Sequence, residues 1–260
     1  MVTETVIYPA RVVHTMERAR PTADAVAVDD GRIVAAGSVA ELQGLGPATV
    51  DDRFAELVLL PGFVEAHSHS FGGGFWQFPY CGYFARWAPD GRLWSGCMSI
   101  DAVLGRLREA EAALTDPDQP LVAWGLDPIY FPGERLTAQH LDRVSTTRPI
   151  FVMHASIHLA TVNTALMTNE GIGPDTMVEG VPKDGAGEPI GELQEPAAMS
   201  LASGAIGELF GALLNDTAIT HFGSLARNAG VTTLTDLGTM SIDDDGVIER
   251  FGRIVNGPGF

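Results

Sequence analysis

The sequence predicts an α/β protein in which a small all-β segment, residues 1–56, precedes a larger region of alternating strands and helices, residues 57–260. Three observations predict this arrangement. A hairpin pattern lies near the N-terminus, an apolar run bounded by proline and glycine follows it, and helical and strand-like segments alternate from residue 99 onward. Alternation of this kind is typical of βα units around a parallel sheet.

The N-terminal segment has the pattern of a small sheet. Strands are expected at 5–8, 25–28 and 33–37, with Asp30-Gly31 supplying the turn between the last two. An Asp-Gly pair between apolar strands is a strong hairpin signal. Ser38 is expected to cap a short helical turn.

A second region begins with the nearly unbroken apolar run 57–66, which favours a strand buried on both faces. His67-Ser68-His69 follows directly. Residues 71–98 are rich in aromatic side chains with neither a helical nor a strand period, so we expect a long ordered loop that covers a pocket. Further along, helices are expected at 99–113, 137–144, 163–167, 195–228 in two pieces and 247–254, and strands at 121–125, 149–154 and 231–236.

Composition excludes several partners. Sixteen basic against 33 acidic residues give a formal charge of −17, which argues against nucleic acid and anionic membrane surfaces. Only Cys81 and Cys97 are present, flanking the loop-like stretch, and two cysteines do not make a disulfide framework. No signal peptide is visible and no apolar stretch is long enough to span a bilayer. We therefore expect a cytoplasmic protein.

The pair His67 and His69 carries the chemistry. Residues i and i+2 of a strand point to the same side, so both imidazoles can share one cation. Strands of a parallel barrel place such residues at the carboxyl-terminal face, where active sites lie. Two histidines in an ordinary surface loop are the alternative, and the spacing by itself does not exclude it.

The residues around this pair resemble the amidohydrolase superfamily, whose first barrel strand ends in Pro-Gly-Phe-(Ile/Val)-(Asp/Glu)-x-His-x-His. Here the stretch reads Leu60-Pro61-Gly62-Phe63-Val64-Glu65-Ala66-His67-Ser68-His69. Further matches point to the amidohydrolase type 3 group, which includes enzymes like N-substituted formamide deformylase. They are the segments 124–127, 148–158, 162–166, 191–195 and 230–236.

The resemblance implies part of a TIM-like (β/α)8 barrel preceded by a β-sandwich segment. It also implies one or two divalent metal ions, with zinc as the expected metal, held in part by His67 and His69. Metal-activated water would then attack an amide-type carbonyl and cleave a C–N bond of a small molecule.

The sequence departs from the family pattern in what it lacks. In other members of the family, a carboxylated lysine that bridges two metal ions, two further histidines and an aspartate general base follow later in the sequence. Lys183, the only lysine here, is a poor candidate for that bridging residue. We therefore expect the general base beyond Phe260. The chain is predicted to be a fragment or half of a split enzyme, completed by a second chain or as a homo-oligomer.

Four further residues are candidates for substrate binding. His158 matches a histidine that recurs near the pocket of the resembled group. Trp124 and Asp127 close a predicted strand and could line the pocket, with core packing and helix capping as equal alternatives. Glu195 either reaches the site or caps its helix.

Two other functional hypotheses stay open. The chain could be a non-catalytic, truncated or structural subunit whose exposed strand edges need a partner. It could also be a binding module that uses its aromatic loop without chemistry.

Overall fold

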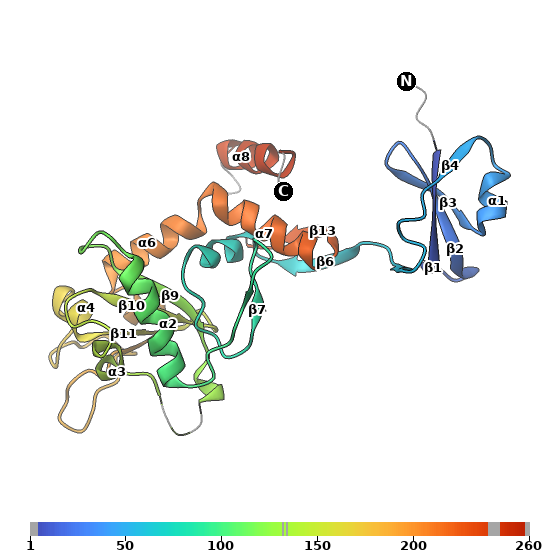
Figure 1. The fold of residues 1–260 in the computed structure, drawn as a ribbon. Coiled ribbons are helices and arrows are strands. Elements are labelled where there is room, and N and C mark those ends of the chain that lie inside the picture. Colours follow the sequence, from blue (N-terminus) through green and yellow to red (C-terminus); the bar gives the residue numbers. More distant parts are fainter. Residues whose placement is uncertain (1–4, 132, 134, 239–244, 258–260) are drawn as a thin grey trace. The chain divides into compact units, whose positions relative to one another are not determined.

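The structure, a computed structural model, describes residues 5–131, 133, 135–238 and 245–257 (Figure 1). The chain forms two compact units, of which the first ends at Val64 and the second begins at Glu65. Within the described ranges, no helix is both long and apolar enough to cross a membrane.

The first unit is a sheet with one short helix. Its elements are β1 (Thr5–Glu17), β2 (Arg20–Asp29), β3 (Arg32–Gly37), α1 (Val39–Gln43), β4 (Ala48–Val50) and β5 (Val58–Leu59). The strand order is β3-β2-β1-β4, and β5 also pairs with β1. Ile7, Ala25, Ala27 and Leu42 form a buried cluster between the sheet and α1.

The expected hairpin in this unit is confirmed. Strands β2 and β3 pair in antiparallel fashion around Asp30 and Gly31, whose φ angles of 45° and 71° are both left-handed. A turn of this kind matches the right-handed twist of the flanking strands, which explains the Asp-Gly pair. Ser38 also caps α1 as expected, in a reciprocal pair of hydrogen bonds with Glu41.

The second unit contains the remaining elements. Its strands are β6 (Phe63–Ser68), which starts at the junction, β7 (Arg86–Trp87), β8 (Leu93–Trp94), β9 (Leu121–Leu126), β10 (Ile150–His154), β11 (Leu159–Val162), β12 (Glu192–Gln194) and β13 (Val231–Asp236). Its helices are η1 (Ser70–Gln77), α2 (Ile100–Ala113), η2 (Pro128–Tyr130), α3 (Ala138–Asp142), α4 (Thr164–Asn169), α5 (Glu195–Met199), α6 (Ser203–Leu213), α7 (Asp216–Asn228) and α8 (Asp245–Val255).

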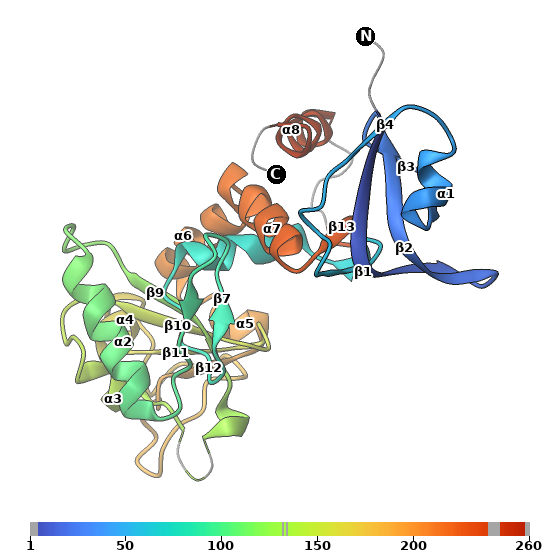
Figure 2. The ribbon, with the colours of Figure 1, turned by 45° about the vertical axis from the view of Figure 1, so that its right-hand side comes forward.

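A four-stranded sheet, in the order β12-β11-β10-β9, forms the centre of this unit (Figure 2). Because side chains alternate across a strand, β9 and β10 supply two cores. One face, with Ile150 and Val152, packs against the apolar side of α2. The other face, with Phe151, packs against α6 and the aromatic Phe75 of η1. Burial on both faces explains why these strands are continuous apolar runs.

This sheet is mixed, whereas the sequence predicted a parallel one. Strands β9 and β10 are parallel, with α3 in their connection, but β11 is antiparallel to β10 and β12 is antiparallel to β11. The reason is the short turn 155–158 between β10 and β11, because a parallel return needs a crossover of a dozen or more residues. The chain is therefore a mixed α/β protein, and its described residues form no closed barrel.

Strand β6 pairs with β13 in a separate two-stranded sheet. The prediction that the run ending in Ala66 is buried on both faces was wrong, since every residue of β6 from Phe63 to His67 is exposed. The physical reason is that β13 is its one strand partner among the described residues, and helix α7 packs beside β13 rather than over these residues of β6.

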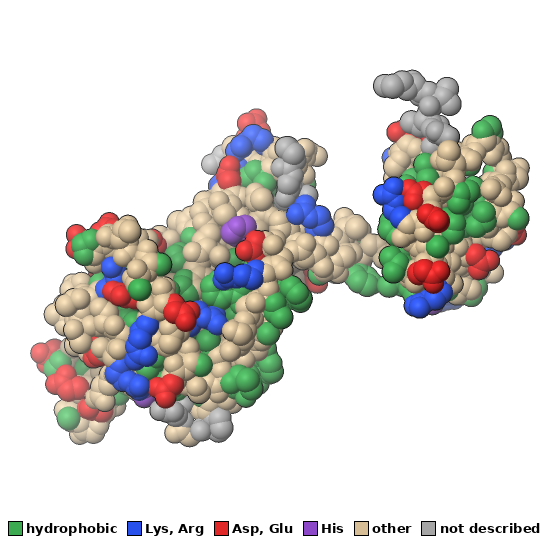
Figure 3. All heavy atoms as spheres, in the orientation of Figure 1, with side chains coloured by type: hydrophobic (Ala, Val, Ile, Leu, Met, Phe, Trp, Pro, Cys, Tyr) green, Lys and Arg blue, Asp and Glu red, His purple; other side chains and the backbone are tan. Residues whose placement is uncertain are grey.

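The aromatic stretch 71–98 has more structure than the predicted loop. It includes most of η1 and the short antiparallel hairpin of β7 and β8. Phe75 and Tyr80 are buried, and each of them packs against Trp124 of β9. Most of these aromatic rings therefore hold η1 and the hairpin against the four-stranded sheet, while hydrophobic side chains (green) also gather on the surface around β7 (Figure 3).

Candidate metal centre

His67 and His69 lie near the end of β6, and their rings are neighbours. The ring centroids are 5.2 Å apart and the ring planes are nearly perpendicular, at 89°. His67 is exposed and His69 is half-buried. The i, i+2 spacing on an extended strand produces this proximity, and it lets two imidazole nitrogens approach one cation.

The surroundings of His69 fix the position of its ring. Phe71 stacks on it with a centroid distance of 5.2 Å and an angle of 12°. Gly238 follows β13 and approaches so closely that a Cβ atom there would lie 2.4 Å from His69 Nδ1. A side chain at this position would therefore push the imidazole away.

Asp236, the last residue of β13, lies beside the same ring. Its Oδ1 atom is 3.9 Å from His69 Nδ1, within ion-pair range but too long for a hydrogen bond. The carboxylate is held by the backbone N–H groups of Ser70, at 3.1 Å, and Gly238, at 2.9 Å. Nδ1 of His69 is buried and has no hydrogen-bond partner. A small movement of the ring would let it donate to Asp236.

These donors fit part of a metal site. Two imidazoles suit two positions of a divalent ion, and a carboxylate beside a ligating histidine is the usual outer partner that orients it. In the described ranges, no group of three or more His, Cys, Asp and Glu side chains could hold a metal ion. A zinc site takes three or four protein ligands, so the pair is an incomplete set.

His158 and Glu195, two predicted substrate-binding residues, do meet. His158 Nδ1 lies 2.8 Å from Glu195 Oε2, and both side chains are more than half exposed. The backbone N–H of Glu195 also donates to the His158 carbonyl at 2.7 Å. Glu195 and Ile157 both have a φ of 65°, a left-handed conformation that non-glycine residues rarely adopt. The strained backbone on both sides of this pair is typical of functional sites.

Trp124 and Asp127, the other two predicted substrate-binding residues, have structural contacts. Trp124 is buried and packs against Phe75, Trp76 and Tyr80, and its indole N–H has no hydrogen-bond partner. Asp127 caps η2 by accepting the backbone N–H of Ile129 at 3.1 Å. Both alternatives weighed from the sequence, core packing and helix capping, are therefore present.

A buried polar group at the ends of β10 and β12 was not assigned to the site from sequence. His154 is almost fully buried, and its Nε2 lies 2.9 Å from the Thr161 hydroxyl. Burial lowers the pKa of His154 to about 4, so the ring is neutral at pH 7. Glu192 is also buried, and accepts hydrogen bonds from Arg135 at 2.8 Å and Gln194 at 2.7 Å. The position of His154 at the end of the predicted strand 149–154 is the one sequence signal for these buried polar residues.

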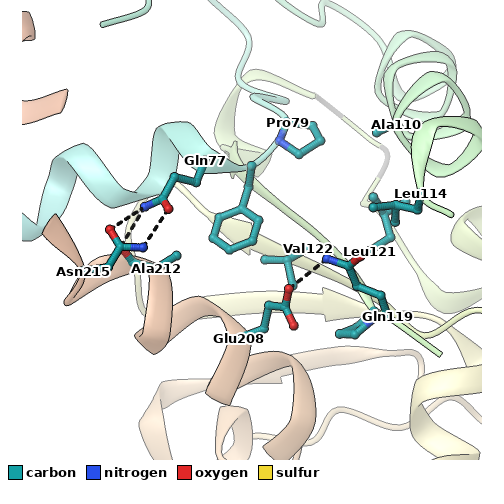
Figure 4. A pocket seen from close by; sticks show the side chains of 12 residues that line it. Gln77, Pro79, Ala110, Leu114, Gln119, Leu121, Val122, Glu208, Ala212 and Asn215 are labelled. Atoms are coloured by element: carbon teal, nitrogen blue, oxygen red, sulfur yellow. Dashed lines mark hydrogen bonds between the residues drawn. The ribbon is translucent and has the colours of Figure 1, made fainter. Parts of the chain in front are cut away.

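The predicted site residues thus fall on two sheets. His67 lies on β6 and His69 directly after its last residue, with Asp236 on the paired strand β13. The other four lie along or next to β9, β11 and β12. A separate pocket of about 390 Å³ opens near the amino-terminal end of β9 and includes none of them (Figure 4). Its polar pairs are Gln77 with Asn215 and Gln119 with Glu208.

Comparison with known proteins identifies the class. The model of the amidohydrolase family matches residues 55–249, which include β6, β13 and both histidines. The chain therefore belongs to the amidohydrolase family, as the motif at His67 and His69 predicted.

Individual relatives agree with this assignment. The chain is 26% identical over 230 residues to protein LONG AFTER FAR-RED 3 of Arabidopsis thaliana, covering 87% of this chain and 37% of that protein. It is 30% identical over 199 residues to N-substituted formamide deformylase of Arthrobacter pascens, covering 74% and 34%. The chain thus spans about a third of the length of these relatives.

A solved structure shares the fold. An uncharacterized metal-dependent hydrolase from Pyrococcus horikoshii OT3 superposes with a TM-score of 0.56 at 15% identity, covering 96% of this chain and 47% of that one. At this identity the likeness concerns the fold.

Proposed function

We propose that the chain forms part of a metal-dependent amidohydrolase that hydrolyses a C–N bond of a small amide-type substrate. The single observation that carries this proposal is the pair of neighbouring imidazoles at His67 and His69, placed on the strand whose motif matches the family. A relative named for deformylation of N-substituted formamides supports a substrate of the amide type.

His67 and His69 would hold one or two divalent ions, with zinc as the expected metal. Bound metal would lower the pKa of a water molecule and polarise the substrate carbonyl. Asp236 would orient the His69 ring, and Phe71 and Gly238 would limit its movement. The remaining ligands and the general base would come from residues beyond Phe260 or from a second chain.

The exposed pair His158 and Glu195, with Trp124 and Asp127, would contact the substrate. A hydrogen-bonded histidine and carboxylate offer both a donor and an acceptor to an amide. The two cysteines are free thiols, so we propose a reducing cytoplasm as the location.

Metal binding by purified protein tests the proposal. We expect zinc retained after equilibrium dialysis of the wild-type chain, and at least tenfold weaker binding in a His67→Ala/His69→Ala variant. His14→Ala removes an exposed histidine from β1 and is the matched control, with expected wild-type binding. Equal zinc retention in the double variant and the wild type would contradict the proposal.

A second candidate function is a structural subunit that needs a partner chain. The observation favouring it is the exposure of apolar side chains on and beside the paired strands, with Phe63 at 52%, Val64 at 69% and Leu237 at 58%. Unpaired strand edges associate with other strands. This function predicts a homo-oligomer or a stable complex on size-exclusion chromatography without zinc uptake, whereas a zinc-binding monomer would contradict it.

A further inference from the structure

Cys81 and Cys97 lie together at the base of the hairpin that carries β7 and β8. Their side chains are 0% and 1% exposed, and their thiols are hydrogen-bonded to each other. Both belong to the core cluster between α2 and the four-stranded sheet. Neither thiol takes part in the proposed hydrolysis.

The backbone holds the two residues close to each other. Cys97 N–H donates to the Gly82 carbonyl at 2.8 Å, and Cys81 N–H donates to the Trp124 carbonyl at 2.7 Å. A Cβ atom on Gly96 would lie 1.9 Å from the Tyr83 carbonyl oxygen, so 82–83 and 96–97 run side by side. Hydrogen-bonded neighbours such as Cys97 and Gly82 have Cα atoms about 5 Å apart, and Cys81 is the residue next to Gly82. Disulfides span Cα separations of about 4.4–6.8 Å, so this arrangement suits a disulfide without large backbone movement.

Arg106 of α2 ties the two sides of this base together. Its guanidinium donates to the Tyr80 carbonyl at 2.6 Å and to the Ser95 carbonyl and hydroxyl at 3.2 and 3.1 Å. A cation at this position favours a thiolate nearby.

The two thiols are not equivalent. The hydrogen bond from Cys81, together with the positive charge of Arg106, lowers the pKa of Cys97 to about 7, although burial and Glu109 oppose the shift. The hydrogen bond to Cys97 and burial raise the pKa of Cys81 well above its usual value. Cys97 is therefore the thiol that reacts first, and Cys81 is the thiol that attacks in the second step.

We propose that Cys81 and Cys97 form a redox-sensitive dithiol that a hydroperoxide converts into an intramolecular disulfide. The Cys97 thiolate attacks one oxygen of the hydroperoxide, so that an S–O bond forms and the O–O bond breaks. When the oxidant is hydrogen peroxide, the leaving group is hydroxide. The Cys81 sulfur then attacks the sulfenic acid, an S–S bond forms and water leaves. Overall, two thiols lose two electrons and two protons, and one hydrogen peroxide becomes two water molecules.

The disulfide would fix the hairpin on the sheet. The segment between the cysteines carries Tyr83 and Phe84, whose rings lie 5.1 and 4.8 Å from Tyr130 of η2. Closing the base of this segment constrains the unfolded chain, so oxidation stabilises the hairpin and its aromatic contacts. Disulfides in cytosolic proteins are usually transient and redox-sensing, which is consistent with the proposed location.

Peptide mapping of the whole purified chain tests this inference. After treatment with a small excess of hydrogen peroxide and unfolding under non-reducing conditions, we expect the 81 and 97 peptides to be joined, with two hydrogens lost and both thiols protected from alkylation. Dithiothreitol should reverse the change, and the melting temperature of the oxidised chain should rise by about 5 °C or more. Two alkylatable thiols, or only disulfides between chains, would overturn the proposal.

Three variants separate the steps. In Cys81→Ser, Cys97 should gain two oxygens as sulfinic acid, whereas Cys81 in Cys97→Ser should stay reduced. Arg106→Gln should slow disulfide formation about fivefold at pH 7, with Arg108→Gln on the same helix as the matched control at the wild-type rate. Equal oxidation of the single thiol in both cysteine variants would contradict the assigned order of attack.

Discussion

Apolar runs of the sequence form strands β9 and β10 and lead into strand β6, but these strands lie in two sheets with opposite environments. In the sheet of β9 to β12, every residue of β9 and β10 is buried, between α2 on one face and α6 with η1 on the other. In the pair β6 and β13, the residues from Phe63 to His67 are exposed. An apolar run thus predicts a strand suited to burial, and burial itself depends on which neighbours are present.

The polar groups of the two sheets differ in the same way. The four-stranded sheet buries His154, which is hydrogen-bonded to Thr161, and Glu192, which is hydrogen-bonded to Arg135. The pair β6 and β13 presents His67 and His69 where a ligand can reach them. The first sheet therefore buries its polar groups, and we propose that the second sheet is where the metal binds.

The largest expected difference between the sheets is in packing energy. Phe151→Ala, in fully buried β10, should lower the free energy of unfolding by about 4 kcal/mol, because it removes a large ring and leaves a cavity. Phe63→Ala, in half-exposed β6, is the matched substitution and should cost less than about 1 kcal/mol. Urea unfolding followed by circular dichroism measures both values. Equal losses would show that β6 is covered in solution.

The next effect concerns pH. The pKa of His154 is about 4 in the folded chain, because burial disfavours the charged ring, and about 6.5 when unfolded. Between these values the unfolded state binds more protons, so stability is present above pH 6.5 and is lost as the pH falls toward 4. The loss reaches about 3 kcal/mol at pH 4.

Unfolding free energies measured from pH 4 to 7.5 check this loss. His154→Gln should reduce the pH dependence of the unfolding free energy in this window, by up to the amount that corresponds to one proton taken up on unfolding. His14→Ala, at an exposed position of β1, should leave the contribution of His154 unchanged. The same slope in His154→Gln and in the wild type would show that His154 is not the group that titrates.

The smallest effect tests the positioning of the candidate ligands. Gly238→Ala should weaken zinc binding about tenfold while changing stability little, because its Cβ would displace the His69 ring. Gly72→Ala, whose Cβ would meet open space, is the control. Isothermal titration calorimetry with zinc measures the affinity of both variants. Equal affinities would show that Gly238 does not hold the His69 ring in its zinc-binding position.

The sequence predicted the local elements well where one short signal decides them. The Asp30-Gly31 hairpin, the Ser38 cap and the strands at 121–125 and 149–154 all form. The family assignment from the motif ending at His69 is confirmed as well. These signals are local, so they do not depend on what the rest of the chain does.

Sheet membership could not be predicted in the same way. The sequence indicated alternating strands and helices, but the antiparallel return at 155–158 and the pairing of β6 with β13 depend on contacts distant in sequence. For the same reason the ring contacts of His69 with Phe71 and Gly238 had no sequence signal. The roles of His158, Trp124, Asp127 and Glu195 in substrate binding stay predictions.

Zinc titration followed by histidine ring resonances in NMR spectra tests the central claim most directly. The chain has seven histidines, and the account predicts that the ring signals of His67 and His69 shift or broaden first as zinc is added. The signals of His14, His140, His154, His158 and His221 should stay in place at that stage. Perturbation that begins at these other rings, or no perturbation of His67 and His69 at any zinc concentration, would contradict the account.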